Sequence, residues 1–163
     1  MYKRQVYEPS GDTLSRRPVI FVAYGGSFIG GERADVDWLC RYYARCGFVA
    51  VAIDYRLYDG PLFPLPDSAD FTDVVIKAMG DMKAAIRYMR EDAATADRFR
   101  INPNMVIASG ISAGGILASH VGFVDSTDSF EPFVIAAVQA NGGWEGNSST
   151  NTQYSSAVDI VVN

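Results

Sequence analysis

The residues with the clearest chemical potential lie at positions 110–114, which read GISAG. Ser112 stands in a G-x-S-x-G pattern, which is typical of the strained turn that exposes a nucleophilic serine. The glycines are needed because neighbouring side chains would collide in such a turn. The alternative is an ordinary small-residue turn between a strand and a helix. Ser112 is therefore a candidate nucleophile whose surroundings must be considered.

The elements predicted on either side of Ser112 favour the nucleophile interpretation. Residues 102–110 form a turn and a buried strand, and residues 112–124 have the composition of a helix. A serine at this junction projects from the carboxyl edge of a sheet, next to a helix N-terminus whose amides favour developing negative charge. We therefore expect an exposed hydroxyl beside backbone donors.

A second glycine-rich segment, YGGSFIGG at residues 24–31, also follows an apolar strand. Acyl transfer needs N–H donors directed at the oxyanion, and they come from the residue after the nucleophile and from such a loop. The candidate donors are the amides of Gly26, Ser27 and Ala113. A nucleotide site is the alternative, but the spacing matches neither G-x-G-x-x-G nor G-K-[ST].

These stretches together resemble the carboxylesterases of the α/β-hydrolase fold, in the branch related to hormone-sensitive lipase. The matching segments are RPVIFVAYGGSFIGG, CGFVAVAIDYRL, DMKAAIRYMRE, FRINPNMVIASGISAGG and GGWEGNSS, and they cover most of residues 17–162 in the family's order. The resemblance implies hydrolysis of carboxylic esters by a Ser-His-Asp/Glu triad, without a metal or a cofactor.

The sequence departs from the family pattern in the glycine-rich loop. Where the family usually has His-Gly-Gly-Gly, this chain has Tyr24 and Ser27 in the outer positions. Because the oxyanion donors are backbone amides, Ser27 can still supply one. Tyr24 is expected to change the hydrogen bonds that hold the loop.

The larger departure concerns the base. His120 is the only histidine in the chain, and it follows Ser112 by eight residues on the predicted helix. That spacing corresponds to about 12 Å along the helix axis, whereas a base must lie within hydrogen-bond reach of the serine. We therefore interpret His120 as a helix-face residue and not as the catalytic base.

No acidic residue occupies the position that the resemblance implies for the catalytic acid. Asp125 and Asp128 follow the predicted helix, and Asp159 lies at the last apolar segment. Asp54 and Arg56, at the end of a predicted strand, are interpreted as a structural pair or a loop anchor.

Substrate-binding candidates come from two loops. Leu62, Phe63 and Leu65 lie in a loop rich in Pro and Gly, and could line or cap an acyl pocket. Glu145, in GGWEG, could line a pocket wall, although a solvated carboxylate is the alternative. No positive cluster lies near either motif, so a small uncharged ester is the expected substrate.

The remaining pattern predicts an α/β fold with a doubly wound, mostly parallel sheet. An edge strand is predicted at residues 5–9, and residues 133–140 could be a strand or the end of a helix. Gly47 is expected to end the first helix, and Gly80 to weaken the long one. The main predicted elements are strands at 18–24 and 48–57 and helices at 34–46 and 70–95.

The resemblance also suggests that residues 1–163 are a partial domain. It would make VDIVVN, residues 158–163, the sixth strand, so that the sheet is truncated there and the acid and histidine lie beyond Asn163. Residues 1–5 resemble translated adapter sequence. We expect little ester turnover from these 163 residues, and poor solubility because an apolar sheet edge is left open.

Composition excludes several other functions. A net charge of −5 argues against nucleic acid as a partner. Cys40 and Cys46 are expected to be free thiols in the core, and no metal site, membrane span or signal peptide is predicted. Localisation and oligomeric state are not predicted. A non-catalytic binding domain on the same scaffold and a peptidase of the same fold are the alternative functions.

Overall fold

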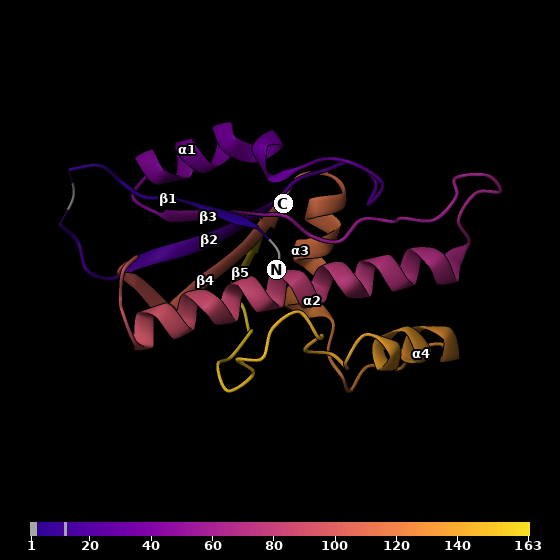
Figure 1. Cartoon of the computed structure of the whole chain (residues 1–163). Coiled ribbons are helices and arrows are strands. Elements are labelled where there is room, and N and C mark those ends of the chain that lie inside the picture. The colour runs from indigo at the N-terminus through magenta and orange to yellow at the C-terminus, as the bar shows by residue number, and fades with distance from the viewer. Residues whose placement is uncertain (1–2, 12) are drawn as a thin grey trace.

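The computed structural model describes residues 3–11 and 13–163, which form a five-stranded sheet with helices packed against it (Figure 1). The sheet order is β1-β3-β2-β4-β5, and only the pairing of β1 with β3 is antiparallel. The mostly parallel α/β sheet predicted from the sequence is confirmed. The strands are β1 (Arg4–Tyr7), β2 (Arg17–Ala23), β3 (Val49–Ile53), β4 (Ile101–Gly110) and β5 (Ile160–Val162).

Helices cover both faces of this sheet. In Figure 1, α1 (Asp37–Arg45) lies on one face and α2 (Ser68–Ala94) on the other. Because β2 and β3 are covered on both sides, residues 18–23 of β2 and all of β3 are uninterrupted apolar runs, and every residue of β3 is buried. The doubly wound arrangement is therefore also confirmed.

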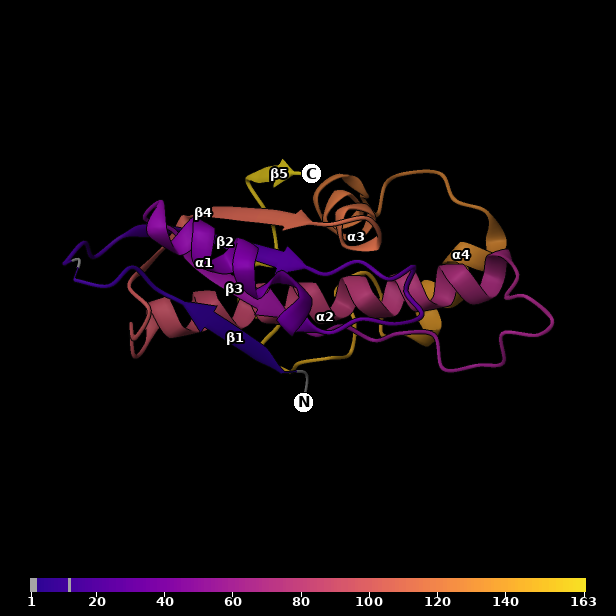
Figure 2. The same ribbon diagram turned by 90° about the horizontal axis from the view of Figure 1, so that it is seen from above.

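β1 and β5 form opposite edges of the sheet (Figure 2). Arg4 and Gln5 belong to β1, and the prediction that residues 1–5 are not native falls partly on residues 1–2, which lie outside the described residues. The predicted last strand at residues 158–163 is present as β5, the fifth strand of the described chain, whereas the expected sixth place was counted along the family's sheet. Ile160 and Val162 are each more than 40% exposed on this edge, so apolar side chains do face solvent there.

The helices follow the local patterns closely. A 3₁₀ turn at Arg33–Val36 leads into α1, and Gly47 follows the helix with φ +95°, a conformation suited to glycine. Both cysteines are free thiols, and Cys40 is buried as predicted, but the prediction that Cys46 lies in the core is wrong, because Cys46 ends α1 on its exposed side. Desolvation raises the pKa of the Cys40 thiol to about 12, which makes it unreactive near neutral pH.

Gly80 does not interrupt α2. Asp67 caps the helix by accepting from the amides of Ala69 and Asp70, and the helix then continues for 27 residues. A Cβ on Gly80 would lie 3.2 Å from Cα of Gly146. Gly80 therefore allows a close approach of the chain after α4 instead of weakening the helix.

The C-terminal part of the chain contains α3 (Ala113–Phe123) and α4 (Pro132–Ala140). The segment that could have been a strand or a helix is the helix α4, with Pro132 in its first turn. Helix α4 packs against α2, away from the sheet. Among the described residues, no helix has the length and apolar character needed to cross a membrane.

The pairing of β2 with β4 contains one irregularity. Arg17 pairs with Ile101 and Val19 pairs with Val106, so residues 102–105 lie opposite Pro18 alone. Proline has no N–H to donate to a ladder, which accounts for the shift at this point. From Val19 onward the pairing is continuous and ends with Ala23 opposite Gly110. The glycine-rich loop and the GISAG turn therefore begin side by side.

Candidate active site

Ser112 lies in a strained turn between β4 and α3. Its backbone angles are φ +54° and ψ −118°, in the left-handed half of conformational space that few non-glycine residues adopt. The side chain is exposed at the N-terminus of α3. The strand, turn and helix predicted around this serine are therefore present.

The two glycines of the motif are required by close backbone contacts. A Cβ on Gly110 would lie 2.2 Å from the carbonyl carbon of Gly114, and a Cβ on Gly114 would lie 2.2 Å from the carbonyl oxygen of Ala23. Backbone atoms cannot move aside as a side chain can. The turn is thus pressed against the end of β2, which holds Ser112 at the carboxyl edge of the sheet.

The glycine-rich loop lies directly beside this turn. A Cβ on Gly25 would be 3.0 Å from the carbonyl oxygen of Ile111 and 3.3 Å from Cβ of Ser112. Gly26, Ser27 and Phe28 all have positive φ. The loop therefore reaches the serine through a sharply folded backbone.

The structure leaves backbone donors available at this junction. The carbonyl of Gly26 accepts from the amides of Ile29 and Gly30, which closes the loop on itself. Within the described part of the chain, the N–H groups of Gly26 and Ser27 donate to no protein acceptor. Ala113 is the first residue of α3, so its N–H has no acceptor within the helix. The three candidate donors therefore have no backbone acceptor among the described residues.

Tyr24 anchors the loop, as its position predicted. Its ring stacks on that of Tyr55 with centroids 4.3 Å apart, the Tyr55 hydroxyl donates to the Tyr24 carbonyl at 2.7 Å, and the Tyr24 hydroxyl donates to the Tyr55 carbonyl at 3.3 Å. Burial raises the pKa of Tyr24 to about 12. A Cβ on Gly31 would meet the Tyr24 ring at 2.6 Å. A neutral, buried tyrosine therefore supports the loop from beneath.

Asp54 and Arg56 are loop anchors, but they do not pair with each other. Asp54 accepts from the Arg33 amide at 2.9 Å and forms an ion pair with the Arg33 guanidinium. Arg56 instead pairs with the buried carboxylate of Asp81 on α2. Both residues lie beyond Ile53, the last residue of β3, and each finds a partner on another element, which the local pattern does not specify.

His120 lies away from Ser112, as helix geometry predicted. Its Nδ1 is 2.8 Å from the carbonyl oxygen of Ile116, and the ring lines a cavity together with Phe71 and Trp144. The cavity lies between α2 and the chain around α4. The only histidine of the chain is thus directed toward α2 and does not contact the serine.

The acidic candidates have structural roles. Asp125 and Asp128 close a turn, in which Asp125 accepts from the Thr127 amide and Asp128 from the Asp125 amide. Asp159 links β5 to β4, because its carboxylate accepts from the Val106 amide at 2.8 Å. None of these carboxylates contacts Ser112 or His120 in the described structure.

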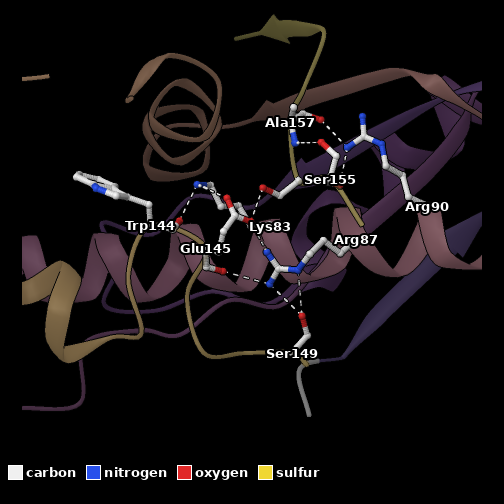
Figure 3. Close-up of polar contacts among 9 residues, drawn as sticks. Lys83, Arg87, Arg90, Trp144, Glu145, Ser149, Ser155 and Ala157 are labelled. Carbon is white, nitrogen blue, oxygen red and sulfur yellow. Dashed lines mark hydrogen bonds and ion pairs between the residues drawn. The ribbon is translucent and has the colours of Figure 1, made fainter. Parts of the chain in front are cut away.

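Glu145 belongs to a charged cluster on α2 (Figure 3). Its Oε2 accepts from Arg87 at 2.6 Å and from the Ser156 hydroxyl at 2.7 Å, and its Oε1 lies 3.4 Å from Nζ of Lys83. Partial burial opposes ionisation, but Ser156, Lys83 and Arg87 together hold the pKa of Glu145 below its ordinary value. Glu145 also faces a surface hollow of about 520 Å³, whose lining does not include Ser112.

The same face of α2 holds the irregular chain that leads to β5. Lys83 donates to the Trp144 carbonyl at 2.6 Å, and Arg90 donates to the carbonyls of Ser155 and Ala157 at 2.7 Å each (Figure 3). We call residues 144–157 the clamped segment. Arg87 is fully buried and binds Glu145 and the Ser149 hydroxyl in the first half of this segment.

The predicted pocket residues of the Pro-rich loop are exposed. Leu62, Phe63 and Leu65 are 51%, 93% and 82% accessible. A hollow of about 280 Å³ next to this loop is lined by residues 57–61 and by α2, and the three side chains are not part of its lining. They are therefore available at the surface.

Three residues important for this arrangement were not predicted. Gly25 is nearest to Ser112, and its place inside the YGGS segment could have indicated this. Arg87 could have been found from the basic stripe that Lys83, Arg87 and Arg90 form at helical spacing. Nothing in the sequence indicated that Tyr55 would pair with Tyr24.

The described residues contain no cluster of three or more His, Cys, Asp or Glu side chains that could hold a metal ion. At the GISAG turn the structure has an exposed serine, Ser112, beside the backbone amides of the glycine-rich loop. Such amides can stabilise negative charge on an oxygen bound next to the serine.

Comparison with known proteins agrees with this geometry. The profile of the BD-FAE family matches residues 5–163. The chain is 29% identical over 116 residues to neutral cholesterol ester hydrolase 1 of Rattus norvegicus, covering 70% of this chain and 25% of that protein. It is 27% identical over 125 residues to the probable carboxylic ester hydrolase LipM of Mycobacterium tuberculosis, covering 76% of this chain and 26% of that protein.

Solved structures of an esterase have the same fold. The propionate-bound and apo forms of esterase 2 from Thermogutta terrifontis are both 26% identical to the chain, with TM-scores of 0.68 and 0.70. Each match covers 98% of this chain and 48% of the esterase. The chain therefore spans about a quarter of the length of the curated relatives and about half that of the solved structures, and its resemblance to α/β-hydrolase carboxylesterases is confirmed.

Proposed function

The chain belongs to the BD-FAE family, and we propose that it carries the nucleophile and the oxyanion hole of a serine carboxylic-ester hydrolase. The observation that carries this proposal is the contact between two loops: Gly25 packs against Ser112, which itself lies in a strained, exposed turn. The names of the relatives, which are ester hydrolases and an esterase, give independent support.

In the proposed reaction, Oγ of Ser112 attacks the carbonyl carbon of an ester. The tetrahedral oxyanion accepts hydrogen bonds from the amides of Gly26, Ser27 and Ala113, which are already fixed by the folded loop and by the helix. The C–O bond to the alcohol then breaks, the alcohol leaves with a proton, and an acyl-serine remains. Attack of water on the acyl-serine releases the carboxylic acid and restores the hydroxyl.

This reaction needs a base to accept the proton of Ser112, and we propose that the base lies outside residues 1–163. His120 is held by Ile116 on the far part of α3, about 12 Å from Ser112 along the helix axis. The 163-residue chain is accordingly expected to acylate slowly and to turn over very little substrate.

The proposed substrate is a small, uncharged ester. The loop and the turn present backbone groups and no ionic clamp for an acidic substrate. The exposed apolar side chains of Leu62, Phe63 and Leu65 are proposed to meet the acyl group, whereas Glu145 is assigned to anchoring the clamped segment.

The experiment is chemical rescue of acylation. The 163-residue chain is incubated with p-nitrophenyl acetate, with and without imidazole, and acyl-Ser112 is measured by peptide mass spectrometry. Imidazole, as an external base, is expected to increase acylation of Ser112. A Ser112→Ala variant should lose this adduct, while Ser119→Ala, a serine change on the same helix, should keep it.

Two results would contradict the proposal. Absence of any acyl-Ser112 in the presence of imidazole would remove the serine from its assigned role. Fast, Ser112-dependent turnover by a monomer without imidazole would instead show that the base lies within residues 1–163.

A further inference from the structure

A cavity of about 290 Å³ lies on the α2 side of α3, apart from the GISAG turn and the glycine-rich loop. Its walls come from the N-terminal half of α2, the end of α3, the chain around α4, and Trp144. Ser112 does not line it, and His120, which does, is eight residues further along α3. This cavity is thus separate from the proposed nucleophile.

The walls of the cavity are apolar and aromatic. Phe71, Phe130 and Trp144 contribute rings, and the rings of Phe130 and Trp144 lie 4.9 Å apart. Met79 closes the interior and is 2% exposed. No Asp, Glu, Lys or Arg side chain is part of the lining. An ionised ligand would lose its hydration there without a charged partner, so the cavity favours a neutral ligand.

One lining side chain supplies a directional polar group. Because a backbone carbonyl can only accept, the 2.8 Å contact between Nδ1 of His120 and the Ile116 carbonyl places the proton on Nδ1. In the tautomer with its only ring proton on Nδ1, Nε2 is an acceptor, and within the described residues it has no hydrogen-bond partner. The hydroxyl of Thr72, by contrast, already donates to the Ser68 carbonyl.

The charged cluster on α2 keeps one wall of the cavity in place. Lys83 binds the Trp144 carbonyl, while the indole extends away from Lys83 and Arg87 (Figure 3). The aromatic wall is thus positioned by a hydrogen bond on its backbone and is not free to collapse into the space.

The volume limits the size of the ligand. An apolar protein cavity of about 150 Å³ is enough to bind benzene, so about 290 Å³ accommodates a molecule of roughly ten non-hydrogen atoms. This is at the lower end of the range for small-molecule sites.

We propose that this cavity binds a neutral, mainly apolar alcohol of up to about ten non-hydrogen atoms, whose hydroxyl donates to Nε2 of His120. The alcohol chain would lie among Phe71, Met79, Phe130 and Trp144. Ser112 is not part of this site. Binding of the alcohol can therefore be tested independently of the proposed hydrolase function.

The test compares two isomers that differ only in the hydroxyl donor. 1-Heptanol can donate a hydrogen bond, whereas hexyl methyl ether has the same atoms and no donor. The reporter is Trp144, one of two tryptophans in the chain. The other, Trp38, is 63% exposed on α1 and is replaced by Phe, so that fluorescence comes from the cavity wall alone. The protein is the 163-residue chain at low micromolar concentration.

We expect saturable changes in Trp144 emission, with 1-heptanol binding about 2- to 10-fold more tightly than the ether, as the loss of one neutral hydrogen bond predicts. His120→Leu should remove this preference while the ether still binds, which a loss of folding could not produce. Val134→Trp should fill the cavity and abolish binding. Phe133→Ser, an exposed neighbour on α4 outside the lining, and Ser112→Ala should leave binding unchanged.

The proposal is overturned if emission does not saturate with either compound, or if the wild-type chain binds the two isomers equally. It is also overturned if Val134→Trp binds 1-heptanol as the parent does, because the response would then arise outside the cavity.

Discussion

The backbone around Ser112 and the clamped segment are both irregular, but they are held in different ways. The glycine-rich loop and the GISAG turn touch through backbone atoms, at distances that leave no room for a Cβ. The clamped segment is held by three long basic side chains of α2 that bind its carbonyls and Glu145. Close backbone contact makes the site around Ser112 rigid and requires glycine at the contact positions. The clamped segment is anchored by side chains, so substitution of one of them should lower the stability only in part.

The strongest test of this difference is Gly114→Ala. The new Cβ would lie 2.2 Å from the Ala23 carbonyl oxygen, so we expect a loss of about 3 kcal/mol or more in the free energy of unfolding, measured with urea. Gly30→Ala is the matched control, because a Cβ there meets nothing within 4 Å. Similar losses for both variants would show that the turn is not held by backbone contact.

A smaller effect is expected for Arg87→Met. The guanidinium is fully buried, but its partner Glu145 is half exposed and can be hydrated after the change. We therefore expect a loss of about 2 kcal/mol, below the usual cost of breaking a fully buried pair. Hydrogen exchange should accelerate within the clamped segment. Arg41→Met, which removes an exposed pair with Asp37 on α1, should change stability much less than Arg87→Met, because solvent screens exposed charges.

Removing the hydroxyl groups of the two tyrosines that support the glycine-rich loop should lower the free energy of unfolding by less than Arg87→Met does. Tyr55→Phe removes the 2.7 Å hydrogen bond to the Tyr24 carbonyl and should cost about 1 kcal/mol. Tyr24→Phe removes a contact of 3.3 Å and should cost less, because hydroxyl hydrogen bonds weaken at that length. Thermal unfolding of both variants measures which one loses more stability. A larger loss for Tyr24→Phe than for Tyr55→Phe would argue against the anchoring role of Tyr55.

The smallest effect is the pH dependence that Glu145 contributes. Its pKa in the folded chain is below the ordinary value of 4.5, so ionised Glu145 stabilises the fold above that value and loses its contribution as the pH falls through the folded pKa. The stability difference between the parent and Glu145→Gln should be less than about 1 kcal/mol near neutral pH, since Glu145 is half exposed. It should shrink further in acid. If the stability difference between the parent and Glu145→Gln stays constant from neutral to acid pH, the ion pairs of Glu145 are not its cause.

The sequence was most informative where steric limits restrict the choice of residue. Gly110 and Gly114 marked the turn, and the apolar run before Ser112 marked a strand buried on both faces. The eight-residue separation of His120 from Ser112 was enough to remove His120 from the catalytic role. These predictions needed only local geometry, and the structure has the corresponding strand, turn and helix.

Predictions that depended on distant partners were less successful. Asp54 and Arg56 were expected to be a mutual pair or loop anchors, and the mutual pair is wrong, because each binds an arginine or aspartate more than 20 residues away. The interaction of Arg87 with Glu145 spans 58 residues. The segment at α4 was ambiguous because its apolar residues follow no clear period. Such contacts depend on how elements pack, which local pattern does not specify.

The irregular pairing opposite Pro18 has a practical consequence for protein engineering. Residues 102–105 form a local excess of chain at the end of β4 remote from Ser112, and the ladder from Val19 to Ala23 is regular despite it. Asn104 and Met105 are exposed. A short affinity tag or a labelled peptide inserted after Asn104 would therefore lengthen β4 at a place that already accommodates extra residues, and the insert would leave the spacing between Gly25 and Ser112 intact.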